Sequence, residues 1–391
     1  MKNSKYPGAI SLTYATMFLE GALNVVLVVF MMTFASIFGK GSAEIALLVS
    51  FKSVGTMVTL YLAGTLSDKF GRKGIMVVGV LLFMAFLLGF IFVRDFNLLL
   101  LFSLLGGIGH GLTDSPGISL IFDAVEGNTG PMISLVQVFF AGGGVVATLL
   151  ASFFINNLIP YQYFFVIFFV LTVMLLLMTL KVRFPKIKNN EPEFKVEEKQ
   201  QIKKNPMKAM VILMVCILFS ATFHVIMTTW TPTFAVDIKH TTEAQGVSIL
   251  SAFQIGSVAG SFALAYLLRK FEMTLFMIIN PLIACVFMVA FIFSNTPTML
   301  FLTLFLIGFF QGVYFSFGIN MGGMMYQKNA GAATGAIGTI NMLGFSVMIS
   351  VSGWFVTHIG VNELMISTIF VGIGLSLIAI LFRNQFNKLR G

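Results

Sequence analysis

The chain has 391 residues, of which 58% are hydrophobic, 14% are aromatic and only 10% are charged. A water-soluble domain of this composition would have too few polar groups to cover its surface, so the composition excludes a soluble protein. The formal charge of +9 lies in short gaps between apolar stretches and in one central segment. Because this pattern is typical of loops beside an anionic lipid leaflet, it indicates a lipid bilayer as the partner and excludes nucleic acid.

Apolar stretches long enough to cross a bilayer follow one another along the whole chain, each requiring about 20 residues. The first half predicts six spanning helices near residues 10–36, 43–67, 74–93, 97–122, 132–156 and 161–182. The second half predicts six more near 208–236, 244–268, 274–294, 298–326, 330–357 and 362–383. The expected fold class is therefore an all-α membrane protein with two six-helix bundles, 1–182 and 208–391, joined by a polar linker over 183–207.

The distribution of basic residues predicts the orientation. We place both termini, the linker and the loops that follow even-numbered helices in the cytoplasm. All but four of the 24 Lys and Arg residues then lie inside. The exceptions are Lys40, Arg94 and Lys239 outside and Lys52 within a helix. This asymmetry follows the positive-inside rule and predicts a multi-pass protein of the cell membrane with cytoplasmic termini.

Motifs of enzymes, cofactors and metals are missing from the sequence. There is no Gly-x4-Gly-Lys-[Ser/Thr] sequence, so ATP hydrolysis is not expected as an energy source. Cys216 and Cys285 lie inside apolar runs and predict neither a disulfide framework nor a metal site. The first apolar run is too long for a cleaved signal peptide. We expect a protein that is not an enzyme and carries no cofactor.

One motif lies between the second and third predicted helices, Gly64-Thr65-Leu66-Ser67-Asp68-Lys69-Phe70-Gly71-Arg72-Lys73. Its glycines permit a tight turn, and its carboxylate and cations suit helix ends at the cytoplasmic surface. The segment resembles the G-x-L-[AS]-D-[KR]-x-G-[RK]-[KR] signature of the major facilitator superfamily at every position. The corresponding stretch of the second half, 265–272, keeps only a basic pair, which indicates a decayed repeat.

This resemblance implies how such a chain would work. It implies two bundles with a solute site between them at mid-depth, alternating access by rocking, and function as a monomer. It also implies a cytoplasmic gating role for the motif residues Gly64, Asp68, Lys69, Gly71, Arg72 and Lys73.

Ionisable residues inside predicted spans are further candidates, since each costs about 2.5–3.5 kcal/mol on insertion scales. They are Glu20, Lys52, His110, Asp114 and His224. At about 1.5 Å per residue, Glu20 and Asp114 lie roughly 15 and 12 Å from the cytoplasmic ends of their helices. Removal from water favours a protonated carboxyl, as a reversible proton carrier requires. Structural alternatives remain open, with Glu20 paired to Lys52 or a hydroxyl, or with Lys52 reaching toward the outer face.

The fourth predicted helix carries a glycine-rich run, residues 106–114, with His110 and Asp114 one turn apart on the same face. Pro116 cannot donate to the carbonyl of Leu112, which predicts a kink. The run resembles the fourth helix of the fucose–galactose–glucose:proton symporter group. That resemblance implies a role for Asp114 in proton and sugar binding. Glu20, at a similar depth, and His110, on the same helix face, are expected to take part with it in proton coupling. A helix-packing carboxyl is the alternative.

Neutral polar residues on several other predicted helices suit a polyhydroxylated solute, because amides offer hydrogen bonds and an aromatic ring offers a stacking face. Each of them alone is equally compatible with hydrogen bonding between helices. The predicted solute-binding residues are Asn24, Gln137, His224, Trp230, Gln254, Gln311, Asn320 and Asn341.

Three functions fit these patterns. The first is uptake of a small polar solute, a sugar above all, by proton symport. The second is proton-coupled export of a drug or metabolite, although the expected glycine-proline motif of helix 5 and arginine of helix 4 are absent here. The third is a membrane scaffold or sensor, which would need neither the intact motif nor the buried carboxyls.

Overall fold

A computed structural model of the chain describes residues 6–124, 130–185, 206–267, 271–326 and 330–390. Every regular element in these ranges is α-helical. Within them, twelve stretches are long and apolar enough to cross a membrane, from Pro7–Val29 to Val361–Leu389. The all-α fold class with twelve candidate spans is therefore confirmed. In hydrocarbon, helices are favoured because each satisfies its backbone hydrogen bonds internally.

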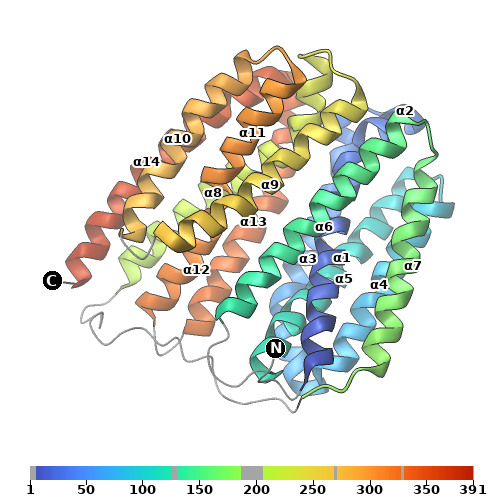
Figure 1. Cartoon of the computed structure of the whole chain (residues 1–391), viewed down its shortest axis with the longest axis horizontal. Coiled ribbons are helices and arrows are strands. Elements are labelled where there is room, and N and C mark those ends of the chain that lie inside the picture. Colours follow the sequence, from blue (N-terminus) through green and yellow to red (C-terminus); the bar gives the residue numbers. More distant parts are fainter. Residues whose placement is uncertain (1–5, 125–129, 186–205, 268–270, 327–329, 391) are drawn as a thin grey trace. The chain divides into compact units, whose positions relative to one another are not determined.

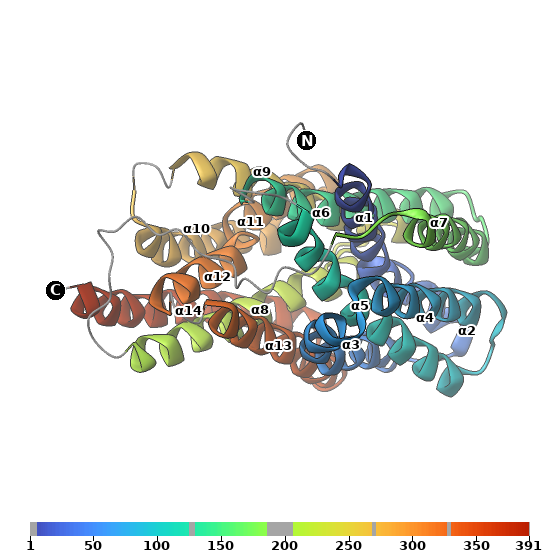
Figure 2. The same ribbon diagram turned by 90° about the horizontal axis from the view of Figure 1, so that it is seen from below.

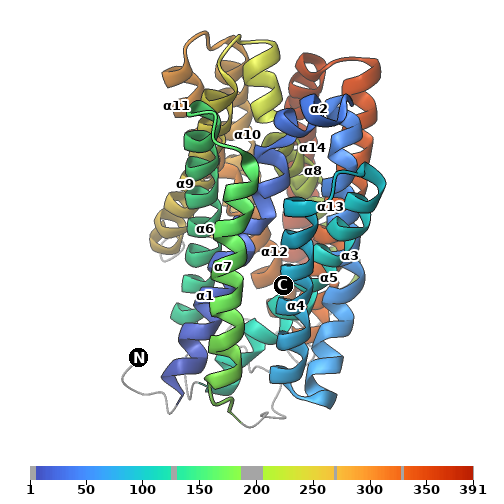
Figure 3. The ribbon, with the colours of Figure 1, turned by 90° about the vertical axis from the view of Figure 1, so that its right-hand side faces the viewer.

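The chain divides into two units, of which unit 1 comprises residues 1–189 and 242–251. Its helices are α1 (Pro7–Val29), α2 (Met31–Phe38), α3 (Ser42–Phe70), α4 (Arg72–Phe92), α5 (Phe96–Ala124), α6 (Gly130–Asn156) and α7 (Tyr161–Lys181). Helix α5 packs against α1, α3 and α4, while α1 also packs against α6 and α4 against α7. Figures 1 and 3 show these helices side by side along the length of the unit. The position of α5 places its side chains at the centre of unit 1.

Unit 2 comprises residues 190–241 and 252–391. It contains α8 (Met207–Asp237), most of α9 (Glu243–Leu267), α10 (Met273–Phe293), α11 (Pro297–Gln311), α12 (Tyr314–Met325), α13 (Ala330–His358) and α14 (Val361–Arg390). Helix α14 packs against α8 and α10, and α8 also packs against α13 (Figure 2). The predicted linker, 183–207, lies largely outside the described residues, so the predicted bundle boundaries stay predictions.

Two predicted helices are interrupted in the structure. The helix predicted over 10–36 breaks at Phe30, which leaves helical geometry with φ −103° and ψ 14°. The helix predicted over 298–326 breaks between Gln311 and Tyr314. Neither break carries a proline, so hydropathy alone could not reveal it. The last helix is longer than predicted, since it continues to Arg390 rather than ending near residue 383.

Glycines set the closest helix contacts of both units. On α5, a Cβ at Gly107 would overlap the carbonyl oxygen of Lys52 on α3, and one at Gly109 would crowd the carbonyl of Gly79 on α4. In unit 2, a Cβ at Gly256 of α9 would overlap the carbonyl of Phe305 on α11. Small residues allow helix backbones to approach in a membrane protein, where packing rather than the hydrophobic effect drives association. The α5 glycine run therefore brings α5 into close contact with both α3 and α4.

The seam between α3 and α5, where Gly107 meets the carbonyl of Lys52, should be sensitive to the addition of a single methyl group. We expect Gly107→Ala to destabilise the protein by about 1–3 kcal/mol, because the added Cβ meets backbone that cannot rotate away. The matched control is Gly142→Ala, since a Cβ at Gly142 has nothing within 4 Å. Thermal unfolding of the purified variants measures the difference, and equal midpoints would contradict this account of the seam.

Candidate functional site

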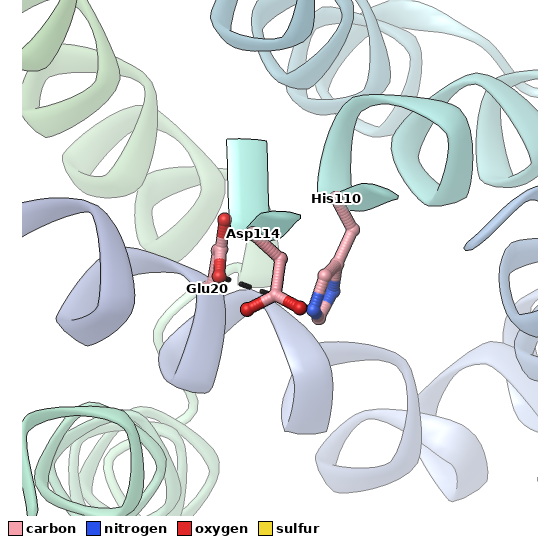
Figure 4. A group of neighbouring side chains, drawn as sticks. All are labelled: Glu20, His110 and Asp114. Carbon is pink, nitrogen blue, oxygen red and sulfur yellow. Dashed lines mark ion pairs between the residues drawn. The ribbon is translucent and has the colours of Figure 1, made fainter. Parts of the chain in front are cut away.

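A buried acidic cluster lies between α1 and α5. Glu20 of α1 and His110 and Asp114 of α5 each place one polar atom within 4.8 Å of the others. His110 Nε2 lies 4.0 Å from Glu20 Oε2. Figure 4 shows the three side chains converging on one point. Glu20 is fully buried, His110 is nearly so, and Asp114 is half-buried. The structure therefore brings together the three residues predicted for proton coupling.

Thr113, which the sequence did not single out, holds one oxygen of Glu20. Its hydroxyl donates to Glu20 Oε1, and the carbonyls of Gly109 and His110 lie 2.9 and 3.1 Å from the same hydroxyl. Glu20 Oε2 is buried and has no hydrogen-bond partner among the residues that the structure describes. A hydroxyl both donates and accepts, so Thr113 can serve either form of the carboxyl. It donates to a carboxylate, and it accepts from a carboxylic acid while turning its own proton to the Gly109 carbonyl.

Lys52 of α3 adds a positive charge beside the cluster. Its side chain is buried, with 4% of its surface exposed, and its charge interacts with Glu20 and His110. The spacing of Glu20, His110 and Asp114 would admit a cation. A divalent metal ion would be repelled by the Lys52 ammonium in this poorly screened interior, whereas a proton adds a single charge.

The motif residues lie at the turn between α3 and α4. Gly71 ends α3 with φ +89°, a conformation that L side chains rarely adopt, so this position requires glycine. A Cβ at Gly64 would press on the Ser115 hydroxyl of α5. Lys69 is exposed and lies over the ring of Phe70, 5.4 Å from its centroid. The side chain of Asp68 lies outside the part of the chain that the structure describes.

The two cations that follow the turn bind two other helices of unit 1. Arg72 Nε forms a buried ion pair with Asp123 Oδ2 at the end of α5. Lys73 Nζ donates to the carbonyls of Leu180 and Val182 at the end of α7, at 2.6 and 3.3 Å, where a cation satisfies terminal carbonyls. The motif thus ties the start of α4 to α5 and α7. Sequence reasoning missed Asp123, whose only signal was its position at the predicted cytoplasmic end of an apolar run.

The predicted solute-binding residues divide between the units. In unit 1, Asn24 and Gln137 are exposed. In unit 2, the His224 ring of α8 lies between the rings of Phe253 and Phe345, with centroids 5.0 and 5.3 Å away. Their role in solute binding stays a prediction.

Two buried glutamines of unit 2 have free acceptor capacity. Gln254 and Gln311 are 9% and 2% exposed, and the side-chain carbonyl oxygen of each has no hydrogen-bond partner within the described residues. The Gln311 amide donates to Ser220 Oγ at 3.3 Å, one turn from His224 on α8. Buried acceptors without partners are costly, so a ligand that donates hydrogen bonds is favoured there.

The other three predicted residues have different surroundings. Trp230 is fully buried and donates through Nε1 to Ser352 Oγ at 2.9 Å, which is the geometry of a packing residue rather than of an open stacking face. Asn320 is exposed and donates to the Ser316 carbonyl of its own helix. Asn341 is buried on α13.

A cavity of about 420 Å³ in unit 1 lies away from these residues. Its walls come from α2, the end of α6 and the start of α7, and include Phe30, Thr33 and Gln162. None of the acidic cluster lines it. The cavity is therefore separate from the ionisable groups between α1 and α5.

Twelve candidate spans with ionisable groups buried among them define a multi-pass membrane protein of the transporter class. The particular family follows from sequence comparison. The chain matches the family model of the Major Facilitator Superfamily over residues 11–295 and again over 242–389, and it belongs to that superfamily. It is a transporter and not an enzyme.

Curated relatives and solved structures agree with this assignment. The chain is 23% identical to the uncharacterized MFS-type transporter YfkL of Bacillus subtilis (strain 168), over 97% of this chain and 96% of the relative. It is 23% identical to the inner membrane transport protein YdiN of Escherichia coli (strain K12), over 67% of this chain and 62% of the relative.

Two similar structures are a bacterial homolog of the human lysosomal transporter Spinster and a D-xylose-proton symporter. Each has a TM-score of 0.77 and 14% identity to this chain. The first comparison covers 98% of this chain and 97% of the other, and the second covers 96% of both. At this identity the similarity shows the fold alone.

Proposed function

We propose that the protein is a secondary active transporter of the cell membrane, with both termini in the cytoplasm, that moves a small polar solute together with protons by alternating access. A sugar is the solute class we favour. The observation that carries the proposal is the cluster of Glu20, Thr113, His110 and Asp114, in which two carboxyls share a buried position. Ionisable groups at such depth are costly and mark ion pathways.

The two carboxyls take different parts in the proposed proton transfer. Asp114 is half-buried and exchanges its proton with water, whereas the fully buried Glu20 holds the proton during the conformational change. Thr113 keeps a hydrogen bond to Glu20 in either protonation state. His110 lies beside both carboxyls and orients them. One proton is taken from water on one side and returned to water on the other, with no change in any other bond.

A hydroxyl-rich solute is supported by unit 2, where the carbonyl oxygens of Gln254 and Gln311 have no donor in the described part of the chain. Each sugar hydroxyl donates one hydrogen bond, and the rings around His224 offer apolar faces. A D-xylose-proton symporter with a similar fold provides a precedent for this kind of coupling on the fold. The motif of Gly64, Asp68, Lys69, Gly71, Arg72 and Lys73 is proposed as the cytoplasmic gate.

The proposal is tested with purified protein in liposomes. An inward proton gradient is imposed, and uptake of radiolabelled D-xylose and a panel of hexoses and pentoses is followed with and without a protonophore. We expect at least one sugar to accumulate above its external concentration, and the protonophore to abolish that accumulation. Accumulation driven equally well by a sodium gradient alone would contradict proton coupling. Proton-driven movement of cytotoxic dyes without sugar uptake would support the exporter instead.

Thr113 provides a sharper test with a conservative pair of variants. Thr113→Val keeps the side-chain shape but removes the hydroxyl, leaving Glu20 Oε1 without its donor. A hydrogen bond to a charged group contributes about 1.5–3 kcal/mol, so we expect proton-driven uptake to slow by about tenfold or more. Thr113→Ser should retain most of the rate. Equal initial rates for the two variants would remove Thr113 from the proposed proton transfer.

A further inference from the structure

Lys52 is a buried cation that the proposed transfer of a proton between Asp114 and Glu20 does not use. We infer that Lys52 is the built-in counter-ion of the acidic cluster, and that its fixed charge limits the cluster to one coupled proton per transport cycle. This inference rests on the proposed proton coupling and adds its stoichiometry. The role of Lys52 follows from the charged side chains that lie close together in unit 1.

The position of Lys52 is determined by the tight seam of α3 and α5. Its carbonyl oxygen packs against Gly107, and the Thr56 hydroxyl lies 3.1 Å from both the Lys52 and the Gly107 carbonyls. His110 and Asp114 follow Gly107 on α5 within two turns. Because only glycine permits this approach, the seam brings the lysine to the level of the cluster.

Helices α1, α2, α4 and α5 pack on α3, and the charged groups that interact with Lys52 come from α1 and α5. Helix α1 supplies Glu20 and α5 supplies His110, and Asp114 lies within 4.8 Å of both of these side chains. Helix α2, Met31–Phe38, has no ionisable residue. On α4, Arg72 and Lys73 lie at its first residues and bind Asp123 and the end of α7. On α3 itself, Glu44 lies at the start of the helix and pairs with Lys40.

The charge balance of the cluster then admits two states. With His110 neutral, two carboxylates against one ammonium leave one negative charge. One proton on Glu20 or Asp114 neutralises the cluster, and a second would leave an uncompensated ammonium in a medium where an isolated charge is very costly. The unprotonated state, with its one negative charge, is reached while half-buried Asp114 exchanges with water, so the cluster alternates between no proton and one proton. In this scheme Lys52 keeps its own proton throughout, and its charge balances whichever carboxylate is ionised.

The inference is tested by counting protonated carboxyls in the purified protein at neutral pH, using the infrared carboxylic-acid band. Glu20→Gln and Asp114→Asn assign the band, and each should abolish it, because the remaining carboxylate is balanced by Lys52. We expect Lys52→Met to double the band relative to wild type, since both carboxyls must then be neutral. Lys52→Arg should match wild type, and the double variant Lys52→Met with Glu20→Gln should return to the wild-type value. Lys208→Met, at an exposed position, is the control.

An unchanged band in Lys52→Met would overturn the inference, as would a band in Asp114→Asn equal to that of wild type. The second result does not depend on whether Lys52→Met folds. Counting the protonated carboxyls needs no transported solute, so this measurement is independent of the liposome assay. If the infrared bands change as expected but no proton-driven uptake is found, the proposed function alone is refuted. If proton-driven uptake is found but the band of Lys52→Met equals that of wild type, the role of Lys52 alone is refuted.

Discussion

Replacing Asp114 by asparagine is expected to abolish proton-driven accumulation of the solute while leaving its exchange across the membrane. Asparagine resembles the protonated carboxyl in shape and charge, but it cannot release a proton. A carrier with a permanently neutral residue beside Glu20 and His110 can still change conformation with solute bound. It has lost the group that links this change to the proton gradient.

The size of the effect follows from the gradient. Each pH unit corresponds to about 1.4 kcal/mol, so one coupled proton and a gradient of about 2 pH units support up to about 100-fold accumulation. We expect a ratio near 1 for Asp114→Asn in the liposome assay. Counterflow exchange should remain measurable, which shows that the variant is folded and binds solute.

The matched control for this variant is Glu363→Gln, which neutralises an exposed carboxyl at the start of α14. It should accumulate solute as wild type does. An Asp114→Asn protein that reaches the wild-type ratio would show that the proton is carried elsewhere, and the proposed role of the cluster would be abandoned.

Removing Asp123 is expected to produce the largest loss of stability among the motif contacts. The side chains of Arg72 and Asp123 are 9% and 2% exposed, and Asp123→Leu would leave the buried guanidinium without this carboxylate. Breaking a buried pair from one side costs about 3–5 kcal/mol, because the remaining buried charge loses the opposite charge beside it. The unfolding midpoint of the purified protein should fall clearly.

A double variant distinguishes the effect of the unbalanced Arg72 charge from the effect of losing the Asp123 side chain. Arg72→Met combined with Asp123→Leu removes both charges, so we expect it to be more stable than Asp123→Leu alone. Lys40→Met breaks the exposed pair of Lys40 and Glu44 and serves as the control, since exposed pairs contribute little. If the single and double variants unfold at the same midpoint, the buried charge of Arg72 is not the source of the loss.

The transmembrane architecture could be predicted from the sequence because the bilayer imposes a length on each apolar run. Twelve spans and the motif at 64–73 were recognised in this way, as were the ionisable residues that hydrocarbon makes costly. The neighbouring positions of His110 and Asp114 also followed from their spacing, since one helical turn separates them.

Contacts between helices were decided only by the tertiary structure. Glu20 and Thr113 are 93 residues apart in the chain, and Arg72 and Asp123 are 51 residues apart, so no local pattern relates them. Which face of α1 meets α5 depends on how the helices rotate as they pack, and glycine seams such as that at Gly107 set this rotation. Periodicity identifies a helix but leaves its rotation about its own axis undetermined. For that reason the ionisable residues were recognised in the sequence, while Thr113 as the hydrogen-bond donor to Glu20 and Asp123 as the ion-pair partner of Arg72 emerged only from the packed helices.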